Sequence, residues 1–169
     1  FGLSAVQMIC LPYVSRFFTQ KDTRRLQMLA SSAALVSLTL TLPIIPVFYF
    51  WGETILTILY GVDFAVANTP LLILATAQGV NAFFGIVWPL LTMTGHERTS
   101  MWGLMVSTIV NIVLNAILIP EYGAIGAAVA TGTSIIVWNF IFWVGAFRHL
   151  KVDGSPLSVF KYRRLQGKY

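Results

Sequence analysis

The sequence predicts an all-α fold, a polytopic bundle of transmembrane helices. Hydrophobic residues make up 57% of the 169 residues and charged residues only 10%, whereas a soluble domain carries about 25% charged residues. The charged residues separate long uncharged runs, four of which reach the roughly 20 apolar residues that cross a bilayer. The run LLILATAQGVNAFFGIVWPLL, which starts at Leu71, is apolar on nearly all sides. Helices buried in a large soluble protein keep a polar face, so that alternative is rejected.

The uncharged runs place the helices in order along the chain. We expect membrane helices over residues 1–18, 26–50, 70–94, 99–119 and 123–147, a short helix over 53–60 at the outer surface, and a basic tail over 148–169. The first run holds too few uncharged residues to cross about 30 Å of hydrocarbon. We therefore expect it to be a truncated helix, and the chain to be a C-terminal fragment of a longer protein.

Prolines and small residues predict the irregular points of these helices. Pro43 and Pro46 favour a kink in the second helix, and Pro89 favours a bend near the end of the third. Pro120 to Gly123 predicts a tight turn that joins the last two helices into a hairpin. Small residues then recur every four positions, at Gly126, Ala130 and Ser134. This spacing lets two membrane helices approach closely.

The basic residues predict the orientation of the bundle. All 11 Lys and Arg residues fall in the loop after the first helix, the loop at Arg98 and the tail, while the alternate loops carry only Glu53, Asp63 and Glu121. Cytoplasmic loops carry the excess of Lys and Arg. We expect a multi-pass protein of the cytoplasmic (inner) membrane with a cytoplasmic C-terminus, whose basic tail binds anionic lipids.

Neutral amides inside the predicted helices are the main candidate binding groups. Substrate contacts are predicted at Gln78, Asn81, Asn111, Asn115 and Asn139, and also at Arg16, which ends the first helix. Amides donate and accept hydrogen bonds with neutral polar groups, and a guanidinium pairs with an anion. The alternatives stay open: membrane bundles commonly use amides to join helices, and Arg16 also suits a membrane-surface anchor.

Several kinds of chemistry find no support in the sequence. Apart from Arg16 at the end of the truncated first helix, no Asp, Glu, Lys or Arg lies inside a predicted span, and no phosphate-binding loop or nucleophile–base pair appears. His96 and His149 are expected to be solvated loop residues, without the neighbours of a zinc site. We therefore predict a protein that is not an enzyme, with no metal, no cofactor and no nucleic-acid partner.

Two segments resemble a known transporter family. They are LYG from Leu59 with Phe64, and a longer pattern that runs from Asn111 and Asn115 through Leu118-Ile119-Pro120 to Gly123 and Gly126-Ala127-Ala128. Together they resemble the C-terminal half of Wzx-type polysaccharide flippases of the multidrug/oligosaccharidyl-lipid/polysaccharide (MOP) exporter superfamily. The resemblance implies part of the C-terminal lobe of a MATE-like transporter.

The resemblance also implies a function. Such proteins move polyprenyl-diphosphate-linked oligosaccharides to the outer leaflet for surface polysaccharides such as the O-antigen of lipopolysaccharide, alongside membrane proteins of polysaccharide assembly. A multidrug exporter or a peptidoglycan-precursor flippase of the same superfamily remains an alternative. A membrane scaffold without transport is a third reading. The absence of intramembrane carboxylates weighs against a proton-coupled drug exporter.

Overall fold

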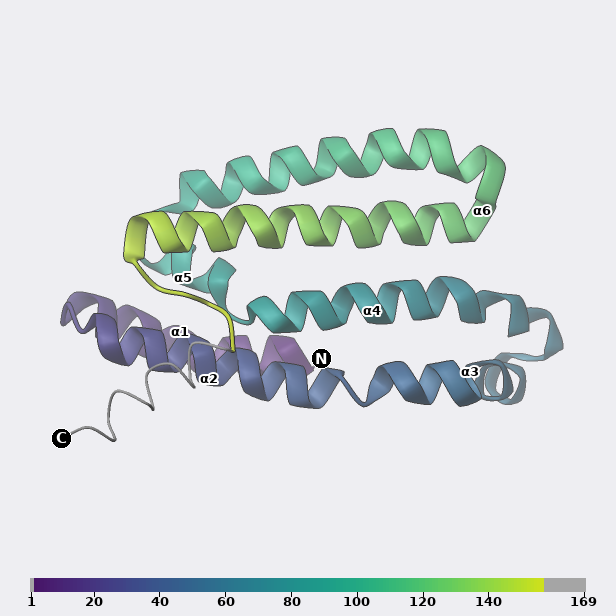
Figure 1. Ribbon diagram of the computed structural model, residues 1–169, viewed down its shortest axis with the longest axis horizontal. Coiled ribbons are helices and arrows are strands. Elements are labelled where there is room, and N and C mark those ends of the chain that lie inside the picture. Colours follow the sequence, from purple (N-terminus) through teal and green to yellow (C-terminus); the bar gives the residue numbers. More distant parts are fainter. Residues whose placement is uncertain (1, 157–169) are drawn as a thin grey trace.

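The computed structural model describes residues 2–156, and side chains from Val6 onward. The described chain is helical without strands, which confirms the all-α prediction (Figure 1). The elements in order are α1 (Gly2–Thr19), α2 (Thr23–Thr41), α3 (Ile44–Tyr60), the 3-10 helix η1 (Val62–Ala67), α4 (Asn68–Phe84), α5 (Val87–Met93) and α6 (Glu97–Leu150). The predicted basic tail lies outside the described residues from position 157 onward.

The longest element, α6, is a helical hairpin. Its chain reverses at Gly123, where φ is 53° and ψ is −127°, and the two arms run back along each other (Figure 1). This backbone conformation is essentially restricted to glycine. Close packing of the arms begins directly afterwards, because a Cβ at Gly126 would lie 2.4 Å from the Leu118 carbonyl oxygen. Each arm holds more than 25 residues and is about 40 Å long.

The helix expected over 26–50 is interrupted. α2 ends at Thr41 and α3 begins at Ile44, because Pro43 and Pro46 each lack the N–H that would continue the hydrogen-bond ladder. The short helix expected over 53–60 forms the second half of α3, and Figure 1 shows this end of α3 turned end-on to the view, out of line with its first half. Gly52 lies where the two halves meet and packs directly against the Asn68 side chain. The position of this half at the outer membrane surface stays a prediction.

The helix expected over 70–94 is also divided. α4 and α5 meet at Gly85, which has φ of 60°, and the bend between η1–α4 and α5 is 48°. Pro89 explains the position, because its missing N–H frees the carbonyl four residues earlier. That Gly85 carbonyl accepts a hydrogen bond from Gln7 Nε2 at 3.4 Å. The break therefore precedes the proline by one helical turn.

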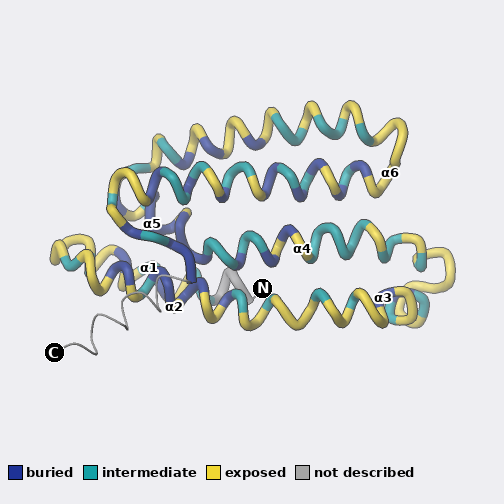
Figure 2. Tube along the Cα trace, viewed as in Figure 1, coloured by how far each residue is buried: buried dark blue, intermediate teal, exposed yellow. Residues whose placement is uncertain are grey.

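The length and composition of the helices suit a membrane. Two described stretches, Thr23–Tyr60 and Glu97–Leu150, are long and apolar enough to cross one, and the bent pair Val62–Phe84 and Val87–Met93 makes a third if it counts as one span. α3 and the first arm of α6 are mostly exposed (Figure 2). An apolar surface of this size indicates contact with lipid or with further protein. The number of crossings stays a prediction.

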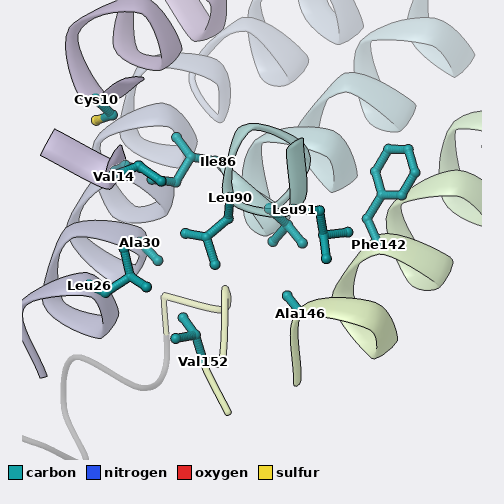
Figure 3. Close-up of a cluster of buried hydrophobic side chains, with 12 residues drawn as sticks. Cys10, Val14, Leu26, Ala30, Ile86, Leu90, Leu91, Phe142, Ala146 and Val152 are labelled. Atoms are coloured by element: carbon teal, nitrogen blue, oxygen red, sulfur yellow. The ribbon is translucent and has the colours of Figure 1, made fainter. Parts of the chain in front are cut away.

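The core surrounds the short helix α5. Leu90 and Leu91 are at most 1% exposed and contact side chains from α1, α2 and the second arm of α6 (Figure 3). After α6, the chain crosses back toward α2 as an extended strap, residues 151–156 (Figure 1). Val152 of the strap is fully buried in the same core. This strap joins the last helix to the first two.

The basic segments meet at one end of the bundle. The α1–α2 connection, the start of α6 and its C-terminal end lie together there, whereas the acidic connections after α3 and at the α6 turn lie at the opposite end (Figure 1). Contacts support this arrangement, since the rings of His96 and His149 stack with centroids 4.5 Å apart. Both histidines were expected to be solvated loop residues: His149 is exposed but lies in the last turn of α6, and half-buried His96 directly precedes that helix.

Candidate functional site

A chain of three amides joins α4 to the second arm of α6. Asn139 Nδ2 donates to Asn81 Oδ1 at 3.0 Å, and Asn81 Nδ2 donates to Gln78 Oε1 at 3.2 Å. The spacing of three residues puts Gln78 and Asn81 on one face of α4. Asn139 also donates to its own helix at the Ile135 carbonyl, at 2.9 Å. Three of the predicted site residues therefore form one hydrogen-bonded group.

A second chain of polar groups joins the two arms of α6. Asn115 Nδ2 donates to Asn111 Oδ1 at 3.0 Å, and Asn111 Nδ2 donates to Ser134 Oγ at 3.3 Å. Ser134 in turn donates to the Thr131 carbonyl at 2.8 Å. Sequence reasoning had assigned Ser134 only to close packing. Its place in the small-residue pattern was the signal that it faces the neighbouring arm.

The two amide chains share the second arm of α6, which contributes Ser134 to one and Asn139 to the other. Ser134 and Asn139 are five residues apart on the second arm, so they point about 140° apart and lie about 7.5 Å apart along its axis. The second arm therefore presents one polar group to the first arm and another to α4, as its position between them requires (Figure 1). We call these residues the amide band: Gln78, Asn81, Asn111, Asn115, Ser134 and Asn139.

Burial divides the amide band into two kinds of residue. Asn139 is 5% exposed; its hydrogen bond to Asn81 joins two helices, and its hydrogen bond to the Ile135 carbonyl stays within its own helix. Gln78 is exposed, and within residues 2–156 its side-chain NH2 group donates no hydrogen bond. Buried amides must be satisfied internally, whereas an exposed amide keeps donors for another molecule. Gln78 is thus the band residue best placed to contact a ligand.

An apolar groove lies beside the amide band. It has a volume of about 420 Å³ and runs between α3, α4 and the second arm of α6. Ile45, Tyr49, Ala77, Val80 and Ile136 contribute to its lining, and Thr76 and Thr133 add hydroxyls. Both hydroxyls donate to their own helix, Thr76 to the Leu72 carbonyl and Thr133 to the Val129 carbonyl, each at 2.8 Å. The groove is therefore suited to hydrocarbon.

Arg16 does not join the amide band. It is exposed in the last turn of α1. Gln7 of the same helix donates a hydrogen bond to the Gly85 carbonyl, so this part of α1 lies close to the amide band. Arg16 is nine residues farther along α1, about 13 Å closer to the basic end. Arg16 therefore lies apart from the amides, toward the basic end of the bundle, where it was expected to end the first helix. Its own role in binding substrate stays a prediction.

The strap contains polar contacts that sequence reasoning missed. Gln27 is 2% exposed and pairs with the backbone of Asp153: its Nε2 donates to the carbonyl, and its Oε1 accepts from the N–H at 2.7 Å. The Asp153 carboxylate accepts from Trp143 Nε1 at 3.0 Å. Asp153 was expected to lie in the basic tail over 148–169. A glutamine within an apolar helix was the only sequence signal of this contact.

The described residues contain no cluster of three or more His, Cys, Asp or Glu side chains that could hold a metal ion. The polar groups inside the bundle are neutral amides and hydroxyls. They can accept and donate hydrogen bonds, and they offer no charge to a substrate. Such an interior suits a hydroxyl-rich neutral group better than an organic cation.

An all-α bundle with an apolar exterior and a band of neutral amides defines a polytopic membrane protein. The chain belongs to the lipid II flippase MurJ family, which it matches over residues 1–166. This family lies in the MOP superfamily, so the predicted superfamily is confirmed. It is a family of transporters, in agreement with the prediction that the chain is not an enzyme.

Two curated relatives are similar to most of this chain. The probable low-salt glycan biosynthesis flippase Agl15 of Haloferax volcanii is 27% identical over 156 residues, which cover 91% of this chain and 33% of the relative. The uncharacterized membrane protein MJ1068 of Methanocaldococcus jannaschii is 25% identical over 140 residues, 82% of this chain and 28% of the relative. The chain thus spans about a third of the length of these relatives. No solved structure matches it at a significant level.

Proposed function

We propose that the full-length protein flips a polyprenyl-diphosphate-linked oligosaccharide across the cytoplasmic membrane for surface glycan synthesis, as a Wzx-type flippase does. The amide band is the observation that carries this proposal. It provides neutral hydrogen-bonding groups on α4 and on both arms of α6, with the exposed Gln78 at one side. Membership of a flippase family and similarity to a glycan flippase support the same substrate class.

In this proposal the residues of the band have different tasks. Gln78 donates to sugar hydroxyls, while Asn139 and Asn111 hold the three helices at the spacing that Gln78 needs. Asn81 and Asn115 are half-buried and do both. The apolar groove beside the band takes the hydrocarbon part of the lipid. The diphosphate is bound by cationic residues, of which Arg16 is one candidate at the basic end.

The orientation belongs to the same proposal. The basic end of the bundle faces the cytoplasm, and the turn at Gly123 faces outward. The basic tail binds anionic lipids, and other membrane proteins of polysaccharide assembly act beside the transporter. The separation of basic and acidic connections to opposite ends of the bundle supports this orientation.

A test of the substrate contact uses Gln78→Leu in the full-length protein, reconstituted in proteoliposomes. Loss of hydrogen bonds to neutral hydroxyls lowers the rate of oligosaccharide-lipid transfer about three- to tenfold at limiting substrate. Thr39→Val is the matched control, because Thr39 is exposed on α2, lies outside the groove, and its hydroxyl donates to the Leu35 carbonyl of its own helix at 2.8 Å. Equal effects of the two substitutions contradict the assignment of Gln78.

A second candidate substrate is the peptidoglycan precursor lipid II. The match to the lipid II flippase family over residues 1–166 favours it. The two substrates share a polyprenyl diphosphate and differ in the attached saccharide. Parallel transfer assays with lipid II and with a peptide-free oligosaccharide lipid separate the candidates, because the preferred headgroup is transferred faster by the same preparation.

A further inference from the structure

A second cavity lies at the basic end of the bundle. Its volume is about 460 Å³, within the range of ligand sites in proteins. The C-terminal turn of α1, the α1–α2 connection, the start of α2 and the end of α6 enclose it. Its lining includes Phe17, Phe18, Lys21, Thr23, His149 and Leu150.

The polar side of this cavity favours an anion. Lys21 supplies a positive charge, and Thr23 adds a hydroxyl in the first turn of α2. The neighbouring Asp22 does not oppose an anion, because its carboxylate pairs with Arg25 Nε at 3.1 Å and also accepts from the Arg25 N–H at 2.9 Å. Lys21, by contrast, has no carboxylate within ion-pair distance in residues 2–156.

The backbone holds Lys21 in place at the cavity. Lys21 has φ of 55°, and its N–H donates to the Phe18 carbonyl at 2.9 Å while the Asp22 N–H donates to the Phe17 carbonyl at 3.0 Å. These bonds close the end of α1 in the way that usually uses glycine. A residue with a side chain is less stable than glycine in this left-handed conformation. Lysine at this position therefore brings a charge to the cavity at a cost that glycine would avoid.

The other side of the cavity is apolar. Phe17, Phe18, Leu26 and Leu150 line it, and Phe18 is 40% exposed at the end of α1. A free phosphate ion gains no favourable contact with these apolar side chains. A phospholipid can contact both sides of the cavity, because its phosphate lies within a few ångströms of the start of its acyl chains. Basic cavities between helices at a membrane surface are typical lipid headgroup sites.

We propose that the cavity between the α1–α2 connection and the end of α6 binds the phosphate headgroup of an anionic membrane phospholipid, with Lys21 as its charged contact and Phe18 against the first acyl carbons. The site joins the start of α2 to the end of α6, so the bound lipid bridges two elements far apart in the sequence. This inference does not depend on which substrate the full-length protein transports.

The test measures lipid binding by native mass spectrometry of the full-length protein in detergent. Titration with phosphatidylglycerol gives a one-to-one adduct, and phosphatidylcholine binds more weakly. Lys21→Gln raises the Kd for phosphatidylglycerol about fivefold, the effect of removing one lysine near a membrane surface. Inorganic phosphate at the concentration of the lipid does not displace it.

Lys151→Gln is the matched control. Lys151 is also a lysine with positive φ, 56°, at the end of a helix at the same end of the bundle, and it does not line the cavity. The control variant keeps the wild-type Kd within about twofold, since its charge acts only through screened solvent. Equal weakening by both variants means diffuse attraction to the basic surface and overturns the proposal. Equal binding of the two lipids, or displacement by phosphate, also overturns it.

Discussion

Gly85 provides a sharp test of how the bundle is held together. A Cβ at this position would lie 2.8 Å from both Cα and Cβ of Ala34 and 3.0 Å from its backbone nitrogen. Neither backbone can yield without moving α2. Gly85→Ala therefore combines a conformational cost of about 1–3 kcal/mol, from φ of 60° and ψ of −114°, with an overpacking cost of about 1–3 kcal/mol.

Gly123 separates these two costs. Its φ of 53° and ψ of −127° nearly equal those of Gly85, and a Cβ there would meet no atom within 4 Å. Gly123→Ala therefore lowers stability by the conformational cost alone. The difference between the two variants is the overpacking cost against α2, about 1–3 kcal/mol.

The assay is thermal unfolding of the full-length protein in detergent, followed by the loss of monodisperse protein in size-exclusion chromatography. Both variants unfold at a lower temperature than the wild type, and Gly85→Ala unfolds at the lowest. Equal unfolding temperatures for the two variants would refute the close approach of α2 to the α4–α5 break.

Three further predictions concern other contacts. Asn139→Leu leaves Asn81 without its interhelical partner and lowers stability by about 1–3 kcal/mol, measured by thermal unfolding, while Thr76→Val leaves it unchanged. Gln27→Leu deprives the Asp153 backbone of both hydrogen bonds and speeds proteolysis of the strap; an unchanged cleavage rate contradicts the docked strap. A cysteine in place of Glu121 reacts with an impermeant thiol reagent added outside cells, and one in place of Lys161 does not; the reverse pattern refutes the orientation.

The sequence predicts the helices well because their signals are local. Uncharged runs determine where helices form, and the turn at Gly123 follows from Pro120 and the glycine itself. The bend in the third predicted helix was expected at Pro89 and occurs at Gly85. This displacement has a local reason, since a proline frees the carbonyl one turn before it.

The contacts between helices are not local, and the sequence predicts them only in part. Spacing shows that Gln78 and Asn81 share a face of α4, but it cannot show that this face meets Asn139. The pairing of Gln27 with Asp153 joins residues 126 positions apart and has no periodic pattern. The strap was predicted as tail because its few apolar residues give no helical signal. Val152 of the strap is buried by residues far away in the sequence, so only the packed structure shows its burial.

The most direct measurement for the whole account is lipid transfer by the full-length protein. Proteoliposomes receive a fluorescent polyprenyl-diphosphate oligosaccharide, and transfer between leaflets is read as the fraction protected from a membrane-impermeant quencher, with efflux of a cationic dye followed in parallel. We predict protein-dependent transfer of the lipid without dye efflux, reduced by Gln78→Leu. Dye efflux without lipid transfer would contradict the account and assign the protein to the drug-exporter branch of the superfamily.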